Sequence, residues 1–211
     1  MTYAELVAAI QSYTENQYST TDINTFIQQA EQRIYNSVQL PDLRKNVTGN
    51  MTSGNKYFSL PSDWLSTFSI AVINADNEYT YLLNKDVNFI RESFPDTDSP
   101  FHGVPQYYAI FNDTTMLLGP TPDANYNSEL HYYYYPESIV TAGNTWLGDN
   151  FDSALFYGAL LEAAAFMKEE GDVLTVYAQK YNEAMGLLQN LGEGKNRRDA
   201  YRSGQERIPV K

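Results

Sequence analysis

The spacing of apolar residues changes twice along this 211-residue chain, and this change limits the possible folds more than any other feature. Residues 2–15 and 21–38 place apolar side chains three or four positions apart, as amphipathic helices do. Helical spacing returns over residues 152–168 and 172–191. Between residues 45 and 136 the spacing falls toward two and turn residues recur, which indicates strands. We therefore expect an α+β fold.

These segments predict one body over residues 1–194. Its core should be a four-helix core of two N-terminal and two C-terminal helices, with the β-rich insertion, residues 45–136, between the two helical hairpins. Gly192 and Gly194 follow the last helical segment and should end it. The remaining residues, 195–211, should then form an extended arm.

The arm has a charge opposite to that of the body. It carries six Lys or Arg against Asp199 and Glu206, a net charge of +4 in a chain whose total is −12, so the body is near −16. So short a segment cannot bury a core, and we expect it to order only on a partner. A disordered, solubilising tail is the alternative. Arginine pairs well with a partner's carboxylates. The predicted docking residues are Lys195, Arg197, Arg198, Tyr201, Arg202, Arg207 and Lys211.

A second candidate surface is the run Tyr132, Tyr133, Tyr134 and Tyr135. Successive side chains of a strand alternate, so one face of the run can meet the core while the other meets a partner. Burial on both faces, an interface with another subunit or a tail protein, and a sugar-stacking surface all fit this pattern. Of the two functional interpretations, the interface ranks above sugar binding.

No motif in the chain predicts catalysis. There is no cysteine, and the two histidines, His102 and His131, lack any metal-ligand spacing. The paired acids Glu169 and Glu170 end a helical segment, where a solvated charged face is the simplest interpretation. No nucleophile elbow, phosphate loop or dinucleotide motif is present. We therefore expect no enzymatic activity, no metal and no cofactor.

Charge and hydropathy also limit location and partners. An acidic body disfavours non-specific DNA binding, which depends on Lys and Arg contacts to phosphates. No stretch approaches the roughly 18 apolar residues of a membrane span, and the first 20 residues lack the pattern of a signal peptide. We expect a protein that is made in the cytoplasm and does not enter a membrane.

Eight stretches, taken in order, are similar to a known family: Thr2–Ile10, Thr21–Ile34, Leu60–Leu65, Gly119–Pro122, Glu129–Pro136, Asn144–Leu147, Ala154–Lys168 and Tyr177–Ala184. Together with the terminal arm they resemble the head-to-tail adaptor (connector) proteins of tailed bacteriophages, particularly those of short-tailed phages. Each stretch is a weak packing motif, and the resemblance lies in their combination.

This resemblance implies a structural virion protein in the neck, between capsid and tail. It implies a ring of twelve copies beneath the portal protein, with the helical core forming the ring and residues 195–211 reaching the portal. A tail nozzle or tube protein would be the other partner, and DNA would pass through the channel without specific binding during genome ejection. An aromatic-rich carbohydrate-binding module of a virion or cell surface is the alternative, and a cell-wall hydrolase is a weaker one.

Overall fold

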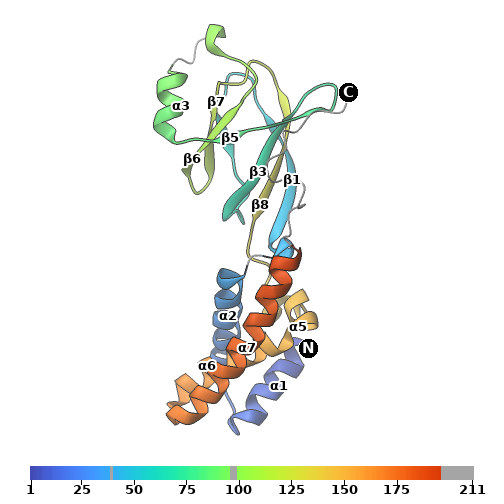
Figure 1. The fold of residues 1–211 in the computed structure, drawn as a ribbon, viewed down its shortest axis with the longest axis vertical. Helices are drawn as coiled ribbons and strands as arrows, with labels where there is room; N and C mark the ends of the chain where they lie inside the picture. The colour runs from blue at the N-terminus through green and yellow to red at the C-terminus, as the bar shows by residue number, and fades with distance from the viewer. Residues whose placement is uncertain (39, 96–98, 196–211) are drawn as a thin grey trace. The chain divides into compact units, whose positions relative to one another are not determined.

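The computed structural model describes residues 1–38, 40–95 and 99–195, which fall into two compact units (Figure 1). The helical unit consists of Met1–Pro41 and the described part of Pro136–Lys211. The β unit is Asp42–Tyr135. Its two ends are therefore joined to the helical unit, into which it is inserted.

Six α-helices make up the described part of the helical unit. They are α1 (Tyr3–Tyr13), α2 (Thr20–Ser37), α4 (Ile139–Ala142), α5 (Trp146–Asn150), α6 (Asp152–Met167) and α7 (Gly171–Lys195). Polar side chains cap the first two, because the first N–H groups of a helix lack partners within it. The Thr2 N–H donates to Glu5 Oε2 at 2.8 Å, and the Glu5 N–H donates to Thr2 Oγ1 at 3.4 Å. Ser19 Oγ accepts from the Asp22 N–H at 3.1 Å.

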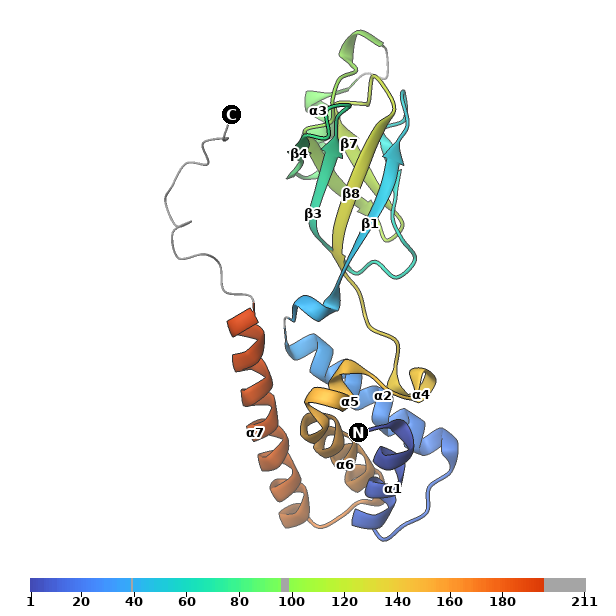
Figure 2. The same cartoon turned by 90° about the vertical axis from the view of Figure 1, so that its right-hand side faces the viewer.

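Helix α6 packs against α1, α2, α5 and α7, so it is surrounded by other helices (Figure 2). Its sequence is apolar on nearly every side, as expected of a helix that is mostly buried, and its exposed apolar residue Phe166 lies near its C-terminal end. Gly158 allows close approach, because a methyl group there would lie 3.1 Å from Ala30 Cβ on α2 and 3.2 Å from the Tyr181 ring on α7. Small residues on α6 thus allow α2 and α7 to pack closely against it.

The predicted four-helix core is wrong, because the described residues form seven α-helices, six in the helical unit and α3 (Val87–Ser93) in the β unit. The unexpected helices α4 and α5 begin at local caps. Ser138 Oγ accepts from the Val140 N–H at 3.2 Å, and Thr145 Oγ1 accepts from the Gly148 N–H at 3.3 Å. With 4 and 5 residues, these helices are too short to show a helical period in the sequence.

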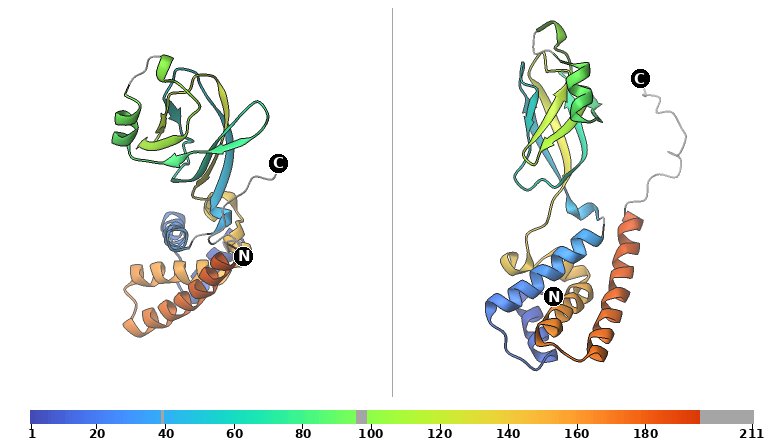
Figure 3. Two further views of the ribbon diagram at one scale, coloured as in Figure 1. Left: turned by 45° about the horizontal axis from the view of Figure 1, so that its top comes forward. Right: turned by 90° about the vertical axis from the view of Figure 1, so that its left-hand side faces the viewer.

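The α+β class and the β-rich insertion are confirmed. The described part of the β unit holds two four-stranded sheets, and its strands can be followed in Figure 3. Sheet A has the order β1 (Arg44–Met51), β8 (Tyr126–Tyr133), β3 (Ser66–Ile73) and β4 (Tyr79–Tyr81). Sheet B has the order β2 (Tyr57–Ser59), β7 (Thr115–Gly119), β6 (Tyr107–Asn112) and β5 (Leu83–Asn84). All pairs are antiparallel except β5 with β6, and short 3₁₀ helices occupy Pro41–Leu43 and Ser99–Phe101.

The two sheets enclose one apolar core. Alternate residues of sheet A, such as Ile70 and Leu130, meet Phe58, Met116 and other residues of sheet B. On the other side of sheet B, Ile90 of α3 packs with Ala109 and Leu117. Sheet B is thus covered on both faces, so its central strand β7 is a nearly continuous buried run, whereas β8 of sheet A alternates.

Helix α7 continues beyond Leu191, where the sequence indicated its end, through Gly192 and Gly194 to Lys195. A helical glycine costs about 1 kcal/mol relative to alanine, which weakens a helix without breaking it. Lys195 is the last residue of α7, and the other residues predicted to form the arm lie outside the described residues.

Candidate interaction surfaces

The tyrosine run at the end of β8 divides between core and surface. Tyr132 is 3% exposed and belongs to the core between the sheets, whereas Tyr133 points to the other face of sheet A. Tyr134 is half-buried, and its N–H donates to the Leu43 carbonyl at 3.0 Å. Tyr135 is exposed. Tyr132 is therefore the buried ring of the run, and the other three rings are more exposed than it is.

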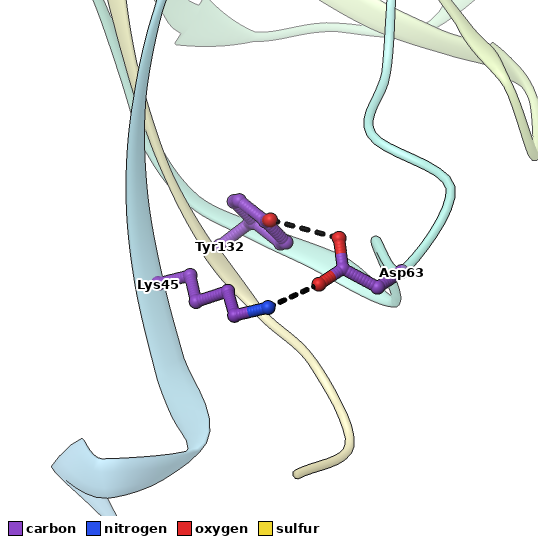
Figure 4. A network of polar contacts seen from close by, with 3 residues as sticks. All are labelled: Lys45, Asp63 and Tyr132. Carbon is purple, nitrogen blue, oxygen red and sulfur yellow. Dashed lines mark hydrogen bonds and ion pairs between the residues drawn. The ribbon is translucent and has the colours of Figure 1, made fainter. Parts of the chain in front are cut away.

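A polar network fixes Tyr132 at the edge of the core (Figure 4). Its hydroxyl donates to Asp63 Oδ1 at 2.8 Å, and Lys45 Nζ lies 2.6 Å from Asp63 Oδ2. Burial and the bond to Asp63 raise the pKa of Tyr132 to about 12. The Lys45 hydrogen bond lowers the pKa of Asp63, and the same bond raises the pKa of Lys45. All three groups thus keep one charge state near neutrality and tie β1, β8 and the turn before β3 together.

Sheet A has an open face, defined as the side chains that point away from the core between the sheets. Strand register places them in rows across the sheet. The first row is Asn50, Asn127, Ile73 and Tyr79, and the second is Thr48, Glu129, Ala71 and Tyr81. Asn46, His131 and Ser69 follow, and then Arg44 and Tyr133. Aromatic and polar side chains therefore mix on this face.

A β-bulge adds Phe68 to the open face. The register of β3 with β8 shifts between Thr67 and Ser69, and the extra residue Phe68 is 48% exposed. Its ring centroid lies 5.0 Å from that of His131, and the Arg44 guanidinium carbon lies 4.3 Å from the same ring. Burial, followed by the nearby Arg44 charge, lowers the pKa of His131, so this imidazole is neutral at pH 7. The cluster is a cation–π arrangement on a surface.

At the other edge of the open face, two rings stack. Tyr79 and Tyr81 have centroids 6.4 Å apart at an angle of 28°, and they are 48% and 57% exposed. The Tyr79 hydroxyl donates to Glu129 Oε2 at 3.0 Å, which raises the pKa of Tyr79. The sequence alone did not single out Tyr79, Tyr81 or Phe68. The alternation Tyr79-Thr80-Tyr81 could have indicated that Tyr79 and Tyr81 lie on one face of a strand, whereas the β-bulge at Phe68 has no recognisable pattern in the sequence.

The helical unit exposes apolar side chains of its own. Val176 and Leu187 of α7 lie about three helical turns apart and so share a face of that helix, and both are more than half exposed. Phe166 of α6 is 58% exposed while its ring contacts Phe26 and Tyr18. These exposed apolar side chains are candidates for an interaction surface.

Charge in the helical unit is almost entirely negative. Before Lys195, the last residue of α7, the basic residues of the helical unit are Arg33, Lys168 and Lys180, among many acids. Arg33 forms an ion pair with Glu162, and Lys180 Nζ lies 3.3 Å from Glu183 Oε2. Two of the three positive charges are thus balanced locally.

The described ranges contain neither a candidate metal site nor a candidate membrane-spanning helix. Within residues 1–38, 40–95 and 99–195, no group of three or more His, Cys, Asp or Glu is placed to hold a metal ion. His102 follows the 3₁₀ helix Ser99–Phe101, and His131 lies beside Phe68. None of the helices in these ranges is long and apolar enough to cross a membrane.

These observations define a two-unit α+β protein whose distinctive surfaces are exposed aromatic and apolar side chains on an acidic background. Residues 1–208 match the model of the SU10 adaptor protein family. Because the match covers nearly the whole chain, this protein belongs to that family. The resemblance to phage head-to-tail adaptors is thereby confirmed. No curated protein matches the chain.

Proposed function

We propose that this protein joins the portal of a bacteriophage capsid to the tail, as a structural component of the virion neck. The observation that carries the proposal is the family match over residues 1–208, which spans both compact units and most of the basic C-terminal segment. The protein is made in the host cytoplasm and acts by assembly, with no chemical step.

Copies of the chain assemble into a ring, twelve in number, through the helical unit. The exposed side chains of Val176, Leu187 and Phe166 support this part of the proposal, because burying such side chains between copies stabilises their association. A ring requires that two different faces of each copy meet head to tail. Exposed apolar residues on both α6 and α7 are compatible with that requirement.

DNA passes through the ring without specific binding. The predominance of acids in the helical unit supports this, since a negative lining repels phosphates and lets the genome slide. The local pairing of Arg33 and Lys180 with glutamates leaves few positive charges to retain DNA.

Residues 195–211 bind the portal. Support comes from composition and position: the segment has a net charge of +4, and its first residue, Lys195, is the last residue of α7. Arginine forks recognise carboxylates bidentately, and repetition around a ring would add avidity to individually weak contacts. Tyr135, the exposed ring of the tyrosine run, and Tyr133, which lies on the open face of sheet A, are proposed to contact the tail nozzle or tube protein.

Electron microscopy of the protein mixed with its portal tests this function. We expect rings on the portal with the full chain, and none after deletion of residues 196–211, while circular dichroism shows the body still folded. A matched pair of variants separates arm charge from total charge: Arg197, Arg198 and Arg202 changed to Gln, against Lys56, Lys85 and Arg91 changed to Gln. Only the first set should abolish binding. Full association without the arm would overturn its assignment, and a monomer indifferent to the portal would overturn the function.

A further inference from the structure

A hollow lies at one corner of the open face of sheet A. Its volume is about 380 Å³, and Thr48, Asn50, Ile73, Asn77, Tyr79 and Asn127 are among the residues that line it. This volume lies within the range of small-molecule sites, at the lower end. All of these residues belong to the β unit.

The register of four strands builds this hollow. Asn50 of β1 pairs with Asn127 of β8, Asn127 with Ile73 of β3, and Ile73 with Tyr79 of β4. The β3–β4 turn adds Asn77, whose φ of 61° is in the left-handed region that asparagine tolerates. Asn74 Oδ1 accepts the N–H groups of Asp76 and Glu78, each at 2.9 Å, and so holds this turn.

The polar groups of the hollow are available to a ligand. Over the described ranges, the side-chain amides of Asn50, Asn77 and Asn127 form no hydrogen bond with the protein. Each amide offers both donors and an acceptor, as does each hydroxyl of a sugar. All three asparagines are among the residues that line this one hollow.

The aromatic wall of the hollow is held in place. The Tyr79 ring is half exposed, stacks on Tyr81, and is anchored through its hydroxyl to Glu129 Oε2 at 3.0 Å. Glu129 Oε1 in turn accepts from Asn46 Nδ2 at 2.8 Å. A fixed ring of this kind is a stacking platform that needs little ordering when a ligand binds.

Charge selects the class of ligand. No Lys or Arg is among the residues that line the hollow, and Glu78 and Glu129 lie beside it on β4's turn and on β8. An anionic ligand would therefore meet repulsion. We propose that this hollow binds one residue of a neutral saccharide, which stacks on Tyr79 and exchanges hydrogen bonds with Asn50, Asn77 and Asn127.

A protein partner fits these observations less well. The first row of the open face has one aliphatic side chain, Ile73, between amides and a tyrosine, whereas the centre of a protein interface is usually more apolar. The proposal does not depend on the adaptor function, because it concerns the β unit alone.

The test uses the full chain on a printed array of neutral, sialylated and uronic-acid oligosaccharides, followed by saturation-transfer NMR with the neutral sugars that bind. Tyr79→Ala and Asn127→Ala should each weaken binding about tenfold, which corresponds to about 1.4 kcal/mol. Tyr57→Ala is the matched control, since Tyr57 is a similarly exposed ring on sheet B. It should leave binding unchanged, and all variants should keep the wild-type circular dichroism.

Several results would overturn the proposal: no neutral sugar bound on the array, a preference for anionic sugars, or binding that survives both Tyr79→Ala and Asn127→Ala. Equal loss in Tyr57→Ala would place the site elsewhere and would also overturn it. Portal binding measured on the same samples reports on the adaptor function separately, so failure of either proposal is distinguishable.

Discussion

Ser128 is fully buried in β8, and within the described residues its hydroxyl has no hydrogen-bond partner. A buried polar group without a partner costs about 1–3 kcal/mol. We therefore expect Ser128→Ala to raise the free energy of unfolding by about 1 kcal/mol, measured by urea denaturation. Ser66→Ala, at an exposed position of β3, is the control and should change little. A destabilised Ser128→Ala protein would show that the hydroxyl does have a partner.

Glu31 of α2 is a carboxyl group in the interior of the helical unit, 3% exposed, where its Oε1 accepts the Ile139 N–H at 2.9 Å. Burial raises its pKa above the usual 4.5, against the opposing effect of that hydrogen bond. The folded state therefore binds a proton more readily than the unfolded state does. The contribution of Glu31 to stability is fully present below the unfolded pKa and is lost as pH rises through the folded pKa.

Because the pKa of Glu31 is raised in the folded state, the difference in free energy of unfolding between the wild type and Glu31→Gln should depend on pH. Glu31→Gln keeps an acceptor for Ile139 but cannot ionise, so it should be at least as stable as the wild type at pH 7. The advantage should shrink as pH falls through the raised pKa toward 4.5. Denaturation curves of both proteins, recorded from neutral to acidic pH, give the difference in their free energies of unfolding. The other titrating groups are the same in both proteins, so their contributions cancel in this difference. A difference that grows on acidification would contradict a raised pKa.

At the scale of elements, periodicity predicted helices such as α2 and strands such as β8 because each of these buries one face. It did not predict α4 and α5, whose 4 and 5 residues depend on the caps Ser138 and Thr145 rather than on a repeating face. These local bonds are why the expected four-helix core was wrong.

The candidate surfaces were less predictable than the elements. In the run Tyr132–Tyr135 all side chains are alike, so alternation could not say which rings face inward. Pairing of β8 with β1 and β3 decides this, since Leu130 and Tyr132 share the core. The bulge that exposes Phe68, and the pairing that assembles Asn50 with Asn127, are likewise long-range properties.

Helix α7 offers a prediction about assembly. Leu187 is 62% exposed, and Leu187→Glu places a charge where the proposed ring would bury an apolar side chain. We expect fewer rings on the portal, counted by electron microscopy, with unchanged helicity of the free chain. Gln189→Glu adds the same charge at another exposed position of α7 and should assemble normally. If both variants assembled like the wild type, this face of α7 would lie outside the ring contact.

At the scale of the whole molecule, the main asymmetry is electrostatic: residues 195–211 carry a net charge of +4 on a chain of −12. If ion pairs hold this segment on the portal, salt must weaken the complex, because the screening length falls from about 10 Å at 0.1 M to about 3 Å at 1 M. The apolar contacts proposed between helical units lack this sensitivity, and salts that are excluded from protein surfaces strengthen them.

The two kinds of contact can therefore be separated on one complex. We expect portal binding by the wild type, followed by sedimentation, to fall steeply over that salt range. The variant with Arg197, Arg198 and Arg202 changed to Gln should bind weakly and show a shallower salt dependence, because fewer ion pairs remain to be screened. Changing Lys56, Lys85 and Arg91 instead should leave the steep dependence intact. Wild-type binding that does not respond to salt would mean that Tyr201 and the apolar residues near the C-terminus, rather than the arginines, provide the attachment.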